Sequence, residues 1–162
     1  MRLRAPAEIR ERVPGDHVLA WLPVADSSLV ATDTALLLPA VGGVEVRVPW
    51  DRVLRASWEP EVFELTAQPE AGGRPVVHRV RFEGDPGVLP EVVRERVTSS
   101  IVVQHHTELL GERGARFVAR RVPGSADLRW AVVFDPGLDP ADPELRRRAD
   151  EALAEFRASL GI

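Results

Sequence analysis

Residues 29–38 read LVATDTALLL, and after the glycine pair Gly42-Gly43 the chain continues as VEVRVPWDRV over 44–53 and RASW over 55–58. Apolar and polar residues alternate along these segments, and short polar turns interrupt them. An alternation with a period of two places the apolar side chains on one face of a strand. This region therefore predicts consecutive antiparallel hairpins that form a meandering sheet with one buried side.

The same alternation predicts seven strands in the first half of the chain, at residues 17–24, 29–32, 35–39, 44–50, 54–58, 63–67 and 76–82. In the fourth of them, alternation places Val44, Val46, Val48 and Trp50 on one face, and in the seventh it places Val76, His78, Val80 and Phe82 inward. The polar pair Asp33-Thr34 supplies side chains that can bond the turn backbone between the second and third strands. Before the sheet, residues 1–16 form a lead-in with a short helix at 7–12, which Pro14-Gly15 stops.

The second half of the chain predicts two helices and one more hairpin. The first helix opens near Leu89 and runs to about Leu110, with an apolar stripe at helical spacing and Gly111 as its stop. Strands at 115–122 and 128–134 follow as a hairpin. The last helix begins with Asp142 as the N-cap and proline at its first position.

Composition narrows the class of protein. The 162 residues match one ordinary domain, and the net charge of −4 argues against nucleic acid as a partner. The chain contains no cysteine, which excludes disulfides, thiol catalysis and cysteine-bound metals. All 21 basic residues are arginine, a bias that we attribute to a high-GC bacterial genome rather than to phosphate clamps.

The chain carries no targeting or membrane signal that we recognise. Residues 1–8 are charged and lack the apolar core of a signal peptide, and no run approaches the ~20 apolar residues of a membrane span. We therefore expect a cytoplasmic protein without integral membrane association.

Residues 30–37 (VATDTALL) and 48–53 (VPWDRV) resemble the hairpin and the following strand start of bacterial pleckstrin-homology-like (PH-like) and GRAM-like domains, of the kind found in actinobacteria. The resemblance covers about residues 13–110. It implies an α+β fold with a seven-stranded antiparallel barrel or sandwich and a capping helix. Residues 111–162 are then expected to be a hairpin and helix packed on the same core, so that 1–162 form a single domain.

PH-like domains bind lipids, peptides or other proteins, so the fold alone does not assign a function. Members that bind phosphoinositides place lysine and arginine in and around the first hairpin loop. Here that loop is VADSS at residues 24–28, which is acidic and has no cation. The sequence therefore argues against recognition of inositol phosphates.

No set of residues predicts catalysis, a cofactor or a metal ion. On a helix, His105 and His106 would point about 100° apart, so we interpret them as a polar cluster rather than as a metal chelate. The serine pairs lack a nucleophile elbow, and the glycine pairs lack the lysine of a phosphate loop. The aspartates at 135–142 lack the spacing of a calcium loop. Ligand-binding residues stay unassigned.

These observations predict a non-enzymatic interaction module, which acts in protein–protein binding or scaffolding in the cytoplasm with an unidentified protein partner; homodimerisation stays open. The alternative is a carrier of a small molecule or lipid between the sheet and the helix at 89–110. That alternative predicts an apolar pocket larger than ~300 Å³ with polar groups such as His78, Arg79 or Thr98. A membrane-surface binder is a third hypothesis.

Overall fold

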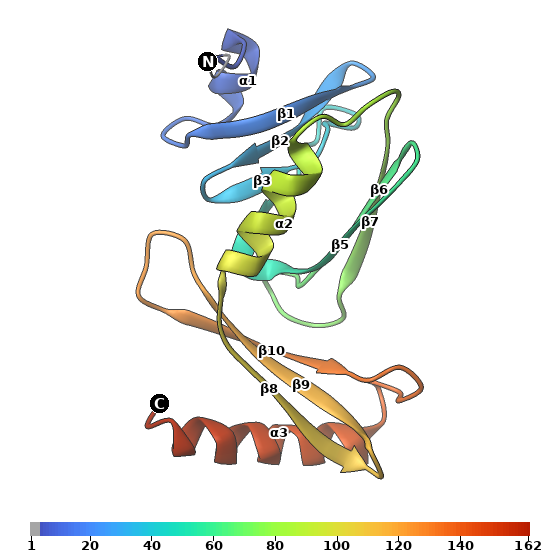
Figure 1. The fold of residues 1–162 in the computed structure, drawn as a ribbon, viewed down its shortest axis with the longest axis vertical. Helices are drawn as coiled ribbons and strands as arrows, with labels where there is room; N and C mark the ends of the chain where they lie inside the picture. The colour runs from blue at the N-terminus through green and yellow to red at the C-terminus, as the bar shows by residue number, and fades with distance from the viewer. Residues whose placement is uncertain (1–3) are drawn as a thin grey trace. The chain divides into compact units, whose positions relative to one another are not determined.

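The computed structural model describes residues 4–162, which fall into two compact units (Figure 1). The first unit comprises residues 4–100 with 122–126, and the second comprises 101–121 with 127–162. Together they contain three antiparallel sheets, which confirms the α+β class. None of the three sheets closes on itself, so the strands do not form a closed barrel.

The first unit holds seven strands in two sheets. Helix α1 (Ala7–Arg12) precedes a sheet of order β1-β2-β3-β4, and a 3-10 turn, η1 (Trp50–Arg52), leads into a sheet of order β5-β6-β7. Helix α2 (Leu89–Ser99) follows and packs on β1, β2 and β5. The strands are β1 (Val18–Val24), β2 (Ser27–Thr32), β3 (Ala35–Leu37), β4 (Arg47–Pro49), β5 (Val53–Glu59), β6 (Val62–Ala67) and β7 (Val76–Arg81).

Strand β2 is buried on both of its faces. Leu29 and Ala31 join a large core with Phe63, Leu65 and the α2 residue Leu89. The alternate residue Val30 points the other way, into a second cluster that includes Ile9 of α1 and Leu37 of β3. Residues 36–38 are covered in the same way, with Leu36 and Leu38 in the large core and Leu37 in the second cluster, which explains why they form a continuous apolar run instead of an alternating one.

The turn between β2 and β3 is organised by the hydroxyl of Thr32, which sequence analysis did not single out. Thr32 is fully buried, and its Oγ1 accepts hydrogen bonds from the backbone N–H of Thr34 at 3.2 Å and of Ala35 at 3.0 Å. The Asp33 carboxylate instead accepts from the backbone N–H of His17 at 2.9 Å. Thr34 donates to Asp16 at 2.6 Å. The predicted pair therefore ties the turn to the start of β1 rather than capping its own backbone.

Strand β4 is shorter than the alternation predicts. A tight hairpin at Val41–Val44 precedes it, with positive φ at both Gly42 and Gly43, as a type I′ turn requires. The ladder between β3 and β4 spans only Ala35–Leu37. Val44 and Val46 therefore lie outside the sheet and are exposed, whereas Val48 and Trp50 are buried. The prediction that all four share one face of a strand is wrong for the two valines, which precede β4.

The prediction that the first long helix reaches Leu110 is wrong. Helix α2 ends at Ser99, where the Ser100 hydroxyl donates to the carbonyl of Val97 at 2.7 Å. Residues Ile101–Leu110 form strand β8 and belong to the second unit. Ile101, Val102 and Val103 are β-branched residues, which favour a strand when a partner strand is present.

The second unit is one three-stranded sheet of order β10-β9-β8 with a helix on it (Figure 1). Strands β9 (Arg113–Arg121) and β10 (Leu128–Phe134) match the predicted hairpin. Helix α3 (Pro143–Ser159) starts as predicted, because the Asp142 carboxylate accepts from the backbone N–H of Glu144 at 3.0 Å. The expectation that this part packs on the core of the first unit stays a prediction.

Candidate functional site

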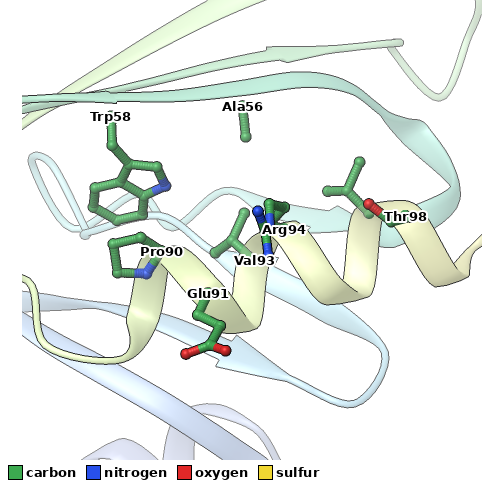
Figure 2. A pocket seen from close by; sticks show the side chains of 8 residues that line it. Ala56, Trp58, Pro90, Glu91, Val93, Arg94 and Thr98 are labelled. Atoms are coloured by element: carbon green, nitrogen blue, oxygen red, sulfur yellow. The ribbon is translucent and has the colours of Figure 1, made fainter.

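A groove lies between strand β5 and helix α2 in the first unit (Figure 2). Its volume is about 430 Å³. The floor is apolar and the rim is polar, with the lining formed by Ala56, Trp58, Pro90, Glu91, Val93, Arg94, Val97 and Thr98.

The two walls follow from strand and helix periodicity. Ala56 and Trp58 are two residues apart on β5, so both side chains leave the same face of the strand, toward α2. Val93 and Val97 are four apart on α2 and lie one above the other on one side of the helix. Val93 is fully buried, so the core beneath the groove is filled. The groove is a surface feature and not an internal cavity.

Trp58 is the largest side chain in the groove, and other aromatic rings hold it in place. Its ring centroid lies 4.3 Å from that of Phe63 and 5.7 Å from that of Phe82, in a tilted and an edge-on arrangement respectively. Such contacts are typical of a rigid aromatic platform. The indole N–H of Trp58 is buried and has no hydrogen-bond acceptor among residues 4–162.

The rim offers a carboxylate, a guanidinium and a hydroxyl, on Glu91, Arg94 and Thr98 of α2. All three side chains are exposed and come from successive turns of one side of the helix. An apolar floor with a few polar groups at its mouth suits an apolar side chain or an amphipathic small molecule.

The three polar groups named for a carrier pocket do not converge. Thr98 lies at the β5–α2 groove, whereas His78 and Arg79 line a second groove of about 540 Å³ along β7. Arg79 forms an ion pair with Glu64 on the neighbouring strand at 2.9 Å. Partial burial lowers the pKa of His78 below its ordinary value, because desolvation disfavours the charged ring.

His105 and His106 lie on strand β8, not on a helix, so they point to opposite faces of a sheet. The His105 ring stacks on Phe156 of α3 with 4.3 Å between centroids. His106 Nε2 lies 2.8 Å from Oδ2 of Asp135. In residues 4–162 no three His, Asp or Glu side chains gather as a metal site would require.

Sequence analysis missed the exposed valines beside the second groove. Val41 and Val44 are 78% and 67% exposed, and they flank the Gly42-Gly43 turn. The sequence contained a signal for this exposure, because a two-glycine turn between apolar residues predicts a hairpin tip that leaves its flanking side chains in solvent.

Comparison of the chain with protein-family models, with curated proteins and with solved structures finds no match. Among residues 4–162, no helix is both long and apolar enough to cross a membrane.

Proposed function

We propose that the chain is a non-enzymatic interaction module of the cytoplasm, which binds a partner protein through the β5–α2 groove. The observation that carries the proposal is the placement of Trp58 in that groove, held by Phe63 and Phe82 and bordered by polar side chains. Aromatic anchors within polar rims dominate the binding energy of many protein interfaces.

The partner in this proposal inserts an apolar side chain between Trp58 and the α2 residues Val93 and Val97. The opposite charges of Glu91 and Arg94 at the mouth then fix the orientation of the partner's polar groups. Rim charges of this kind contribute more to specificity than to affinity, so Trp58 and its apolar neighbours carry the affinity.

We also propose that the first unit has a PH-like architecture. Two antiparallel sheets of four and three strands followed by the helix α2 support it, together with the motif at residues 30–37. This proposal concerns the fold only, because PH-like domains have diverse ligands.

A carrier of a small apolar molecule is the second candidate function. The groove volume of about 430 Å³ exceeds the ~300 Å³ at which small-molecule sites begin. The filled core beneath Val93 counts against it, because a carrier usually buries most of its ligand.

The test uses the full chain as bait in three forms: wild type, Thr98→Arg and Ser99→Arg. Both substituted residues are exposed neighbours on α2, but only Thr98 lines the groove. Mass spectrometry then identifies the proteins retained by each form and the small molecules in an organic extract. We expect a protein that wild type and Ser99→Arg retain and that Thr98→Arg loses.

Two results would overturn the proposal. If a small molecule instead of a protein follows the same pattern, the chain is a carrier. If the purified protein turns over an ester, a phosphate or a nucleotide at ordinary enzymatic rates, it is an enzyme.

A further inference from the structure

The second groove of the first unit runs along the edge of strand β7. Its lining includes five consecutive residues, Val77–Arg81. Successive residues of a strand point to opposite faces, so a groove that touches all five lies against the edge of the strand and not against one face. The β5–α2 groove differs, because it touches only alternate residues of β5.

The edge of β7 that lines this groove is unpaired. Strand β7 is the last strand in the order β5-β6-β7, and within residues 4–162 its ladder pairs it with β6 alone. An edge strand presents a row of free N–H and C=O groups, to which another extended segment can bind as an added strand.

The hairpin before β4 forms the facing wall of the groove, and this wall is apolar and exposed to solvent. Val41, Val44 and Val46 line it, together with the buried Leu38. Two backbone hydrogen bonds of 3.0 Å between Val41 and Val44 fix the hairpin tip. Val77 of β7 is also exposed, on the same face of the strand as Arg79 and Arg81.

The charge of the groove has one sign. Its ionisable lining residues are His78, Arg79 and Arg81, and no carboxylate is among the residues that line it. Arg79 and Arg81 are two residues apart and therefore project from the same face of β7. Arg79 already pairs with Glu64, whereas the exposed Arg81 shows no ion pair in the part of the chain that the structure describes.

We propose that the free edge of β7 binds an extended peptide in which apolar and acidic residues alternate, as a fourth strand of the β5-β6-β7 sheet. Acidic side chains on one face of the added strand lie beside Arg79 and Arg81, where cross-strand opposite charges attract. Apolar side chains on its other face contact the valines of the facing wall. The six residues of β7 span about 20 Å, which limits the paired segment to about six residues.

A second copy of this chain fits the groove less well than an acidic peptide. Antiparallel pairing of two β7 edges would bring the arginines of one copy beside those of the other. Like charges opposite one another destabilise a strand pair.

The test titrates the full chain with two capped peptides, acetyl-Val-Glu-Val-Glu-Val-Glu-Val-amide and its lysine counterpart, at neutral pH and low salt. Backbone amide NMR signals report the site, and amide hydrogen exchange reports strand addition. We expect the glutamate peptide to shift the signals of 41–46 and 77–81 and to slow exchange along β7. We expect the lysine peptide to bind at least about threefold more weakly.

Two charge reversals sharpen the test. Arg81→Glu is expected to lower the affinity for the glutamate peptide by about three- to tenfold and to raise the affinity for the lysine peptide. Arg55→Glu is the matched control, because Arg55 is an exposed strand arginine on β5 that lines neither groove, and its reversal leaves both affinities unchanged. Unaltered signals elsewhere in the spectrum show that each variant is folded.

Several outcomes would overturn the proposal. Equal affinity for the two peptides would show that charge does not select the ligand. Unchanged amide hydrogen exchange along β7 would show that the peptide does not bind as an added strand. Sedimentation of the chain with phosphatidylserine vesicles, without a response to either peptide, assigns the surface to a lipid. A concentration-dependent dimer with protected β7 amides assigns it to a second copy. None of these results bears on the β5–α2 groove, which the Thr98→Arg comparison tests separately.

Discussion

The indole Nε1 of Trp50 donates a hydrogen bond to the main-chain carbonyl of Thr32 over 2.9 Å. Both residues are buried, and the bond joins the end of β2 to the turn η1 that leads into the second sheet. It therefore connects the two sequence motifs, 30–37 and 48–53, that are separated along the chain. A buried bond of this kind is costly to break because water does not replace it.

Two tryptophan substitutions should have different effects on stability. Trp50→Phe leaves the Thr32 carbonyl without its indole donor, whereas Trp58→Phe removes an indole N–H that has no acceptor in the part of the chain that the structure describes. Both variants remove the same atoms, so the difference reports the hydrogen bond together with the deeper burial of Trp50. We expect Trp50→Phe to lower the free energy of unfolding by about 1–3 kcal/mol more than Trp58→Phe. Urea unfolding measures both, and equal losses would contradict the prediction.

Two substitutions of Thr32 test the contribution of its hydroxyl to stability. Thr32→Val keeps the shape of the side chain but leaves the buried N–H of Ala35 without its acceptor. We expect a loss of about 1–3 kcal/mol in the free energy of unfolding. Thr32→Ser retains the hydroxyl and should lose clearly less. A smaller loss in Thr32→Val than in Thr32→Ser would show that the methyl group matters more than the bonds.

The Asp135 carboxylate predicts a pH dependence in the second unit. Hydrogen bonds from His106 and from the backbone N–H of Gly114 lower its pKa below the ordinary 3.8. Because the pKa is lowered in the folded state, the ionised group stabilises the fold above its ordinary pKa, and this contribution is lost as the pH falls through the folded-state pKa. Asp135→Asn should therefore lower the melting temperature near pH 7.

The melting temperatures of wild type and Asp135→Asn should converge in acid, where the wild-type carboxyl is also uncharged. Glu112→Gln serves as the control, because Glu112 is an exposed carboxylate in the β8–β9 turn. A difference between wild type and Asp135→Asn that stays constant from neutral to acidic pH would rule out this account.

Gly114 predicts a steric effect. A Cβ atom at this position would overlap the carbonyl oxygen of Thr107 on the paired strand β8. Gly114→Ala must therefore push β8 and β9 apart, at a cost of about 1–3 kcal/mol. Thermal unfolding of the variant measures the effect, and an unchanged melting temperature would show that the strands separate freely.

The sequence predicts those elements whose signals are local. Asp142 and Pro143 predict the start of α3, and alternation predicts the hairpins around residues 29–38 and 54–67. The end of α2 is different, because the apolar residues after Ser100 fit a helical stripe as well as a strand. Pairing with β9 decides between them, and that partner is not encoded in the local pattern.

In the candidate site too, the local features follow from the sequence and the tertiary contacts do not. Alternation predicts that Ala56 and Trp58 share one face, and helical spacing predicts that Val93 and Val97 do. That these two faces meet depends on the packing of α2 against β5, which the sequence pattern does not specify. The groove along β7 was missed because alternation placed Val44 and Val46 on one strand face with Val48 and Trp50, whereas the two valines are exposed and line the groove.

Helix α1 has a practical consequence for handling the protein. Its residue Ile9, with Val13 just after it, is buried on the back of the first sheet against Val30 and Leu37. Trimming the chain as far as Pro14 to remove a presumed dispensable leader would uncover that cluster and promote aggregation during expression. A truncated form should therefore begin no later than Arg4, and a fusion partner belongs ahead of that residue.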